Sequence, residues 1–128
     1  MATAHDFISR ALRIINVTAE GEAPSAAQAA DALLNLNGLL GGWEAVGIRI
    51  GLPELALADT INLPTSHFAP IVFNLAVSLA TEYGADPQQA DIVKAQDGLD
   101  ALRNMYAQTP VLTLEPEYYR RSDAWFRR

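Results

Sequence analysis

The chain has 128 residues, of which half are hydrophobic, and a formal net charge of −6. This length suits one domain that buries its own core, together with terminal arms. Because the chain contains no cysteine, disulfides and thiolate metal sites are excluded, and nothing indicates an oxidising compartment. The most apolar run, Phe68 to Ala80, is shorter than the about 20 residues that cross a bilayer, so we expect no membrane contact. The N-terminus lacks the features of a secretory signal, and we expect the chain to stay in the cytoplasm where it is made.

Charge is unevenly distributed along the chain. Residues 1–119 carry five basic and fourteen acidic side chains, a balance of −9, whereas residues 120–128 carry four arginines and one aspartate, a balance of +3. Tight binding to a phosphate backbone needs several basic side chains on one surface. The acidic body therefore argues against nucleic-acid binding, and only the basic tail leaves that possibility open.

The first predicted helix begins after Thr3, a good N-cap with Asp6 in the first turn, and runs to about Val17. Its apolar stripe consists of Phe7, Ile8, Ala11, Leu12 and Ile15. Residues 18–24 are rich in turn formers and acids, which predicts an exposed loop.

A second helix is predicted from a capping box, in which Ser25 is followed three residues later by Gln28. Its apolar positions recur at spacings of three and four: Ala29, Leu33, Leu36, Leu40 and Trp43. Glycines favour an end between Gly41 and Gly47. Residues 48–64 then alternate only briefly between apolar and polar side chains, which fits either a small hairpin or an extended crossover.

The third predicted helix spans about residues 66–83 and is apolar on nearly every side, so we expect it at the centre of the fold. Gly84 suits the left-handed residue that closes such a helix. Pro70 has to fall in the first turn, because further along it would delete an internal hydrogen bond. Asn74, inside this apolar helix, is expected to be a buried amide that ties the helix to a loop.

A fourth helix is predicted to run to about Ala107, with Asp86 as N-cap, Pro87 at the first helical position and Gln89 at the third. Its stripe consists of Ile92, Ala95, Leu99, Leu102 and Tyr106. The predicted fold class is therefore all-α: a small four-helix bundle with a short extended crossover. The helical domain would cover residues 1–107, followed by an extended C-terminal arm, residues 108–128.

Catalytic chemistry has few candidates in this sequence. The chain has two histidines, His5 and His67, without metal-ligating neighbours at helical spacing, so we expect cap or surface roles for both. No glycine-rich segment matches a phosphate loop. A glycosidase pair could be chosen only among the glutamates Glu20, Glu22, Glu44, Glu54 and Glu82. Solvated faces explain these acids equally well, and Glu82, beside a helix end, suits a structural hydrogen bond. We therefore predict no catalytic residue, no metal and no cofactor, and a protein that is not an enzyme.

The C-terminal arm holds the candidate binding residues. Its aromatic and arginine side chains lie outside any helical stripe, in a segment too short to form its own core: Tyr118, Tyr119, Arg120, Arg121, Trp125, Phe126, Arg127 and Arg128. Aromatics and arginine are the residues that protein interfaces favour at their centres. A partner-docking arm is the leading interpretation. Folding back on the domain, or contact with nucleic acid through stacking and arginine, are the alternatives.

Several motifs resemble a known family, the packaged-DNA stabilisation proteins, or tail accessory factors, of short-tailed bacteriophages. The similarity extends from about Phe7 to Tyr106. The motifs that carry it are ALRIINVTAEGEAPSA (residues 11–26), LLGGWEAVGI (39–48), Asn74-Leu75-Ala76, Leu79-Ala80 and Glu82-Tyr83-Gly84. Most of these are core and turn residues, which indicate fold more strongly than activity.

The resemblance implies a head-tail adaptor, or head-completion protein, of the virion. Copies, expected to number about twelve, would form a ring under the portal protein, extend the DNA channel towards the tail or nozzle protein and help to retain packaged DNA. DNA would pass through the acidic lumen without specific binding. The C-terminal arm would dock on the portal, by its position in the chain. Side faces richer in apolar residues than one small bundle needs, with Ile14, Phe73 and Val77 among them, are compatible with such a ring.

Two other functions remain open at this point. A tail-associated peptidoglycan hydrolase could use the glutamates named above. A small helical DNA-binding regulator could use the basic end of the arm. The head-tail adaptor remains the leading hypothesis.

Overall fold

The computed structural model describes residues 2–19 and 21–107. They form four α-helices: α1 (Ala4–Ile14), α2 (Ala26–Ala45), α3 (Phe68–Tyr83) and α4 (Gln89–Tyr106), with a 3-10 turn, η1 (Thr65–His67), before α3. This part of the chain has no β-strand, and the predicted all-α class with four helices is confirmed. None of the helices described has the length and apolar character needed to cross a membrane.

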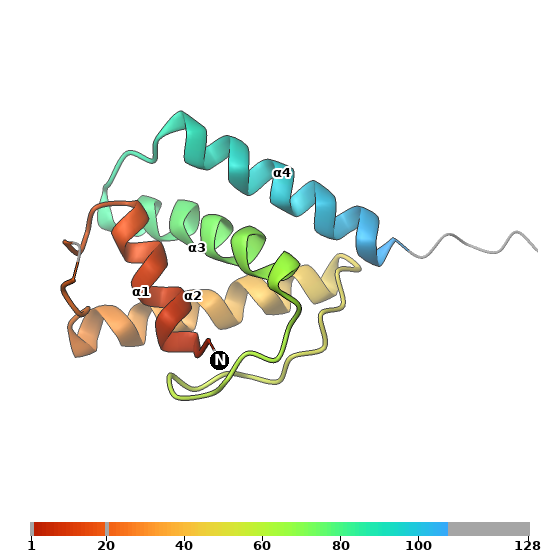
Figure 1. Cartoon of the computed structure of the whole chain (residues 1–128), viewed down its shortest axis with the longest axis horizontal. Coiled ribbons are helices and arrows are strands. Elements are labelled where there is room, and N and C mark those ends of the chain that lie inside the picture. The colour runs from red at the N-terminus through yellow and green to blue at the C-terminus, as the bar shows by residue number, and fades with distance from the viewer. Residues whose placement is uncertain (1, 20, 108–128) are drawn as a thin grey trace, which may run out of the picture.

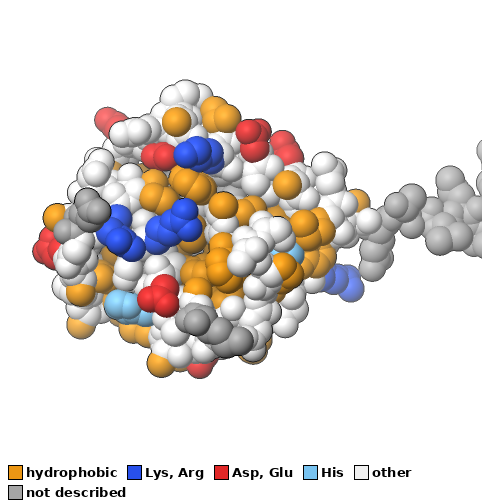
Figure 2. Space-filling view, in the orientation of Figure 1, with side chains coloured by type: hydrophobic (Ala, Val, Ile, Leu, Met, Phe, Trp, Pro, Cys, Tyr) orange, Lys and Arg blue, Asp and Glu red, His pale blue; other side chains and the backbone are white. Residues whose placement is uncertain are grey.

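Helix α3 occupies the middle of the fold and contacts the other three helices (Figure 1). Helix α4 lies along one side of α3, and α2 lies on the opposite side, with α1 packed against both α2 and α3. The side chains of Leu75, Leu79 and Ile71 on α3 are fully buried, as expected for a central helix. Charged side chains lie mostly around the hydrophobic middle of the face drawn in Figure 2.

The start of α1 is capped in two ways. The predicted N-cap Thr3 forms a complete capping box with Asp6: the Asp6 carboxylate accepts from the Thr3 amide (2.9 Å), and the Thr3 hydroxyl accepts from the Asp6 amide (3.3 Å). The amides of Ala4 and His5, which have no partner within the helix, donate to carbonyls of the crossover at Asp59 (3.0 Å) and Leu57 (3.1 Å). The crossover therefore completes the cap of α1.

Helix α1 ends at Ile14, earlier than the predicted Val17. Asn16 adopts a left-handed conformation (φ 60°), and the amide of Val17 turns back to the carbonyl of Leu12 (3.0 Å). Asparagine tolerates this conformation better than most residues, and the bond satisfies a carbonyl that the helix leaves open. The apolar stripe therefore continues to Ile15, one residue beyond the end of the helix.

Residues 46–64 form an extended crossover, not a hairpin. Their one bridge with another segment pairs Thr60 with Thr3, and the Ile61 amide donates to the Ala2 carbonyl (2.9 Å). Asn37 on α2 holds the crossover from the other side: its amide group donates to the Leu55 carbonyl (3.0 Å), and its oxygen accepts from the Leu55 amide (2.8 Å). A single side chain therefore satisfies both polar backbone groups of a buried residue.

Helices α2 and α3 agree closely with their predictions. Helix α2 begins with the capping box of Ser25 and Gln28 and closes at Gly47, whose φ is 99°. Helix α3 closes at Gly84, whose φ is 64°. Pro70 falls in the first turn of α3, where its missing N–H removes no helical hydrogen bond.

Helix α4 begins later than predicted. Its first residue is Gln89, with Gln88 as N-cap, so the prediction of Asp86 as N-cap and Pro87 as first helical residue is wrong. The amide of Ala85 is still engaged in closing α3, through its bond to Ala80 (2.9 Å). Residues 84–88 connect α3 and α4, so the chain closes the first helix and reverses before the second begins.

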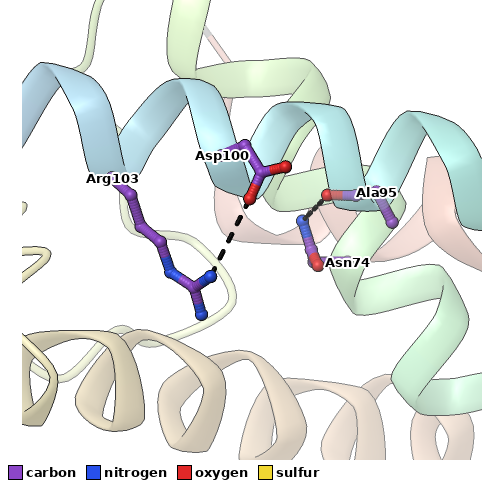
Figure 3. A network of polar contacts seen from close by, with 4 residues as sticks. All are labelled: Asn74, Ala95, Asp100 and Arg103. Carbon is purple, nitrogen blue, oxygen red and sulfur yellow. Dashed lines mark hydrogen bonds and ion pairs between the residues drawn. The ribbon is translucent and has the colours of Figure 1, made fainter.

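Helices α3 and α4 pack closely enough to exclude a side chain at Gly98. A Cβ atom built there would lie 2.9 Å from the Cα atom of Pro70. Asn74 joins the same two helices, since its amide donates to the carbonyls of Pro70 (2.7 Å) and Ala95 (3.0 Å). Figure 3 shows the bond to Ala95 beside the exposed ion pair of Asp100 and Arg103 (3.8 Å). Asn74 thus ties its helix to another segment as predicted, but the partner is helix α4 and not a loop, and the side chain is half-buried.

Candidate partner interface

The predicted docking residues lie outside the described part of the chain. All eight of them, from Tyr118 to Arg128, belong to residues 108–128, so their placement stays a prediction. The last described residue is Ala107, directly after α4. The candidate interface is therefore built from the end of α4 and from the exposed faces of the helices.

The end of α4 is fixed to the domain by a buried histidine. His67, only 3% exposed, shares a hydrogen bond between its Nε2 atom and the Tyr106 hydroxyl (2.7 Å). Its Nδ1 atom lies 3.2 Å from the Ser66 hydroxyl. His67 occupies the N-cap position of α3, as one of its two expected roles required, but its side chain makes no capping hydrogen bond and is buried, so the surface alternative is wrong. Tyr106, predicted as part of the apolar stripe of α4, also makes a polar contact.

A cavity of about 550 Å³ lies at the end of α4. It is lined by Val46, Gly47, Ile48, Arg49, Arg103, Tyr106 and Ala107. Two arginines and an apolar side chain that is 69% exposed, Val46, therefore surround the point from which the C-terminal arm continues. Arginine and aromatic side chains, here Arg49, Arg103 and Tyr106, are also the residues that protein interfaces favour at their centres.

Between the exposed acids Asp31 and Glu44, the outward side of α2 carries no charge. We call this surface the uncharged face of α2; its residues are exposed and recur at helical spacing, and Asp31 borders them at one end: Leu34, Gly38, Gly41 and Ala45. Leu34 is 71% exposed, the highest value among the large hydrophobic side chains described. A helix that is apolar on both its inner and outer sides normally has a further partner. This face is therefore a candidate contact surface.

A shallow groove borders this face between α2 and α3. Its cavity, about 320 Å³, is lined by Leu34, Asn35, Gly38, Leu39, Ser78 and Glu82. The Asn35 amide donates to the Glu82 carboxylate (2.8 Å), which joins the two helices. Glu82 thus makes a structural hydrogen bond, as its position near a helix end suggested.

The apolar residues predicted to be surplus to the domain are half-buried. Ile14 and the two α3 residues Phe73 and Val77 each keep part of their surface in solvent. The ammonium of Lys94 on α4 lies 5.1 Å from the centre of the Phe73 ring, a cation–π contact. Helix α4 therefore covers part of the apolar surface that was expected to contact neighbouring copies. Helix α2 instead exposes a large apolar side chain, Leu34.

Two of the glutamates considered for hydrolysis line one cavity. Glu44 and Glu54 border a space of about 370 Å³ between α2 and the crossover. One Glu44 oxygen accepts from the Gly51 amide (3.3 Å), which gives that carboxylate a structural task. Glu22 likewise accepts from the Ala19 amide (3.2 Å), and Glu20 lies outside the described residues.

Two groups have perturbed pKa values, and neither borders this cavity. The hydrogen bond from the Thr3 amide lowers the pKa of Asp6, and burial raises the pKa of Tyr83. Within residues 2–19 and 21–107, no three histidine or acidic side chains come together as metal ligands would. The described acids therefore act mainly in caps and loops.

Comparison with known proteins gives no family assignment. No family model matches the chain, and no curated protein resembles it closely. Any function has to be argued from the residues and surfaces described above.

Proposed function

We propose that this protein is a head-tail adaptor of a tailed bacteriophage, which assembles as a ring under the portal and docks there through its C-terminal arm. The observation that carries the proposal is the uncharged face of α2. Residues 1–107 contain five basic and twelve acidic side chains, so copies of this domain repel one another wherever their acids meet. The uncharged face is the surface on which acidic copies can pack side by side at the lowest electrostatic cost.

Two further features support a ring over a closed pair. Helices α2 and α4 lie on opposite sides of α3 (Figure 1), and each exposes large apolar side chains: Leu34 on α2, Val93 and Met105 on α4. Different surfaces on opposite sides suit head-to-tail association, which closes into a ring when the rotation allows it. The sequence resemblance described above points to the same assembly.

The test is assembly on the portal of the same phage. The full chain is mixed with the portal, and added rings are counted by negative-stain imaging and native mass. We expect rings with the wild-type chain and none with Leu34→Glu, because the new charge would meet an acidic neighbour. Leu34 is mostly exposed, so this substitution leaves folding nearly unchanged.

Ala58→Glu is the matched control, since it adds the same charge at an exposed position of the crossover. It should assemble like the wild type. If Leu34→Glu forms rings as efficiently as Ala58→Glu, the uncharged face is not the contact between copies. If the wild-type chain does not bind the portal at all, the adaptor proposal fails as a whole.

A second candidate, peptidoglycan hydrolysis, is favoured by one observation: Glu44 and Glu54 line the same cavity. Paired carboxylates are the usual catalysts of glycoside cleavage. A zymogram decides this case. Clearing by the wild-type chain that disappears with Glu54→Gln would establish the hydrolase, whereas a zymogram without clearing would remove it.

A further inference from the structure

A cavity of about 490 Å³ beside the end of α1 concentrates positive charge. It is lined by Arg10, Arg13, Ile14, Asn16, Thr18 and Ala19. Residues 1–107 contain only five basic side chains, and two of them border this one cavity. Figure 2 shows two basic side chains next to each other over α1, the helix that carries both arginines.

Thr18 adds a buried polar group to the same cavity. The residue is 5% exposed, and its hydroxyl has no hydrogen-bond partner among the residues that the structure describes. Buried hydroxyls nearly always have a partner, because leaving one unpaired costs stability. The hydroxyl oxygen is shielded from solvent, so it can donate to an incoming acceptor only when the adjoining loop shifts.

The backbone explains why these groups meet. The left-handed Asn16 turns the chain back along α1, so that Thr18 and Ala19 lie beside the turn that carries Arg10 and Arg13. The amides of residues 15–17 already satisfy three carbonyls at this helix end. Arg13 uses only its Nε atom within the helix, in a bond to the Ser9 carbonyl (3.3 Å). Its terminal guanidinium nitrogens have no described hydrogen-bond partner.

We propose that this cavity binds a phosphate group, either free or within a nucleic-acid backbone. Arg10 and Arg13 would supply the charge, and guanidinium donors match the geometry of phosphate oxygens. The side-chain amide of Asn16 would donate to a remaining oxygen, and so would the Thr18 hydroxyl once the adjoining loop shifts. The cavity is far larger than the about 30 Å³ that one water occupies, which leaves room for a hydrated anion.

Two acids follow the cavity residues along the chain. Glu20 lies outside the described residues. Glu22 accepts from the Ala19 amide at the loop that borders the cavity, so its carboxylate lowers the affinity for an anion without filling the site. The proposal does not depend on the adaptor function, since it concerns a binding site within a single copy.

The first experiment is thermal unfolding of the full chain in phosphate and in chloride at equal ionic strength. Equal ionic strength is needed because screening alone stabilises an acidic protein. We expect phosphate to raise the midpoint of the wild-type chain. The double variant Arg10→Gln/Arg13→Gln should lose this response and bind phosphate at least about tenfold more weakly by calorimetry.

Thr18→Val separates binding from structure, because valine keeps the shape of threonine and removes only the hydroxyl. The variant should be more stable than the wild type in chloride, since an unpaired buried hydroxyl is gone, yet respond less to phosphate. A merely structural Thr18 would not produce this opposite pair of changes. Arg49→Gln/Arg103→Gln is the matched control, because these arginines line the cavity at the end of α4; its phosphate response should equal that of the wild type.

Titration with a short DNA duplex identifies the source of the phosphate. Duplex binding that is lost in Arg10→Gln/Arg13→Gln assigns the site to nucleic acid, and a response to free phosphate alone assigns it to the small anion. The proposal is overturned if phosphate acts no more strongly than chloride and the duplex does not bind. It is overturned equally if the Arg10→Gln/Arg13→Gln variant responds like the wild type.

Discussion

At the scale of single residues, two tyrosines offer a direct comparison of a paired and an unpaired hydroxyl. The Tyr106 hydroxyl lies 2.7 Å from buried His67, whereas the buried Tyr83 hydroxyl has no partner among the described residues. We predict that Tyr106→Phe lowers the free energy of unfolding by about 1–3 kcal/mol, because His67 loses the partner of a buried ring nitrogen. Chemical denaturation at neutral pH measures this change.

Tyr83→Phe is the control for that experiment. Removing an unpaired buried hydroxyl should leave stability unchanged or raise it slightly. Equal losses in the two variants would mean that ring packing, not the His67 bond, determines the role of Tyr106. Hydrogen exchange at the end of α4 should increase only in Tyr106→Phe, because the bond anchors that end.

The glycines of the helices should respond oppositely to alanine. A Cβ at Gly98 would collide with the backbone of Pro70, whereas a Cβ at Gly42 meets nothing within 4 Å. We predict that Gly98→Ala lowers stability by about 1–3 kcal/mol, since α4 has to move away from α3. Gly42→Ala should raise it by up to about 1 kcal/mol, because alanine favours an open helical position. Equal unfolding midpoints of Gly98→Ala and Gly42→Ala would show that α4 can move away from α3 without loss of stability.

Residue roles of this kind were hard to predict from the sequence. The partners His67 and Tyr106 are 39 positions apart, and Gly98 matters only because Pro70 faces it across two helices. Such roles depend on how helices cross, which spacing within one helix does not specify. Asn74 was predicted as a tying amide because a polar residue in an apolar helix needs an internal partner wherever the helix packs.

At the scale of elements, the cap of α1 should make stability depend on acid pH. The hydrogen bond from the Thr3 amide holds the pKa of Asp6 below the ordinary value of 3.8 for an aspartate. A lowered pKa in the folded state means that the ionised carboxylate stabilises the fold at pH above 3.8, and that this contribution disappears as pH falls through the folded pKa. We predict that Asp6→Asn reduces stability at neutral pH and loses less on acidification than the wild type.

Thermal unfolding between pH 2 and pH 7 measures both effects. Thr3→Ala removes the other half of the capping box and should cost about 0.5–2 kcal/mol at neutral pH. The stability of Asp6→Asn and wild type should converge at the acid end. Parallel curves over the whole range would show that Asp6 does not titrate with folding.

The elements were predicted best where the signal is local. The N-cap Thr3, the capping box of Ser25 and Gln28 and the left-handed Gly84 were predicted correctly, because each depends on a few consecutive residues. The start of α4 was predicted wrongly. Asp86 and Pro87 are favourable residues for a helix start, but the chain first has to close α3 and reverse its direction. The sequence does not decide between a hairpin and an extended crossover for residues 48–64, because the partners of this segment, the N-terminus and Asn37, are distant in sequence.

At the scale of the whole molecule, the all-α class followed from helical periodicity, and the central place of α3 from its apolar character on nearly every side. Which helix faces remain exposed did not follow. The apolar residues Ile14, Phe73 and Val77 are half-buried against their own domain. Leu34, which directly follows the predicted stripe residue Leu33, is exposed. Exposure of this kind is decided by the packing of α4 and α2 on opposite sides of α3, and periodicity alone does not fix that arrangement.

The division into a domain and an arm makes the last prediction. All residues of the described core, from Ala4 to Leu102, precede residue 108. A chain ending at Gln108 should therefore have the same unfolding midpoint as the full chain, within about 4–8 °C, the shift that a stability change of about 1 kcal/mol produces. The same truncated chain should fail to add rings to the portal, because the aromatic and arginine side chains that would dock are missing. Differential scanning calorimetry and the ring-assembly assay give the two readings independently. A large fall in the midpoint would mean that residues 109–128 pack on their own domain, the alternative to docking, whereas unchanged stability with intact ring assembly would transfer the portal contact from the arm to the helical domain.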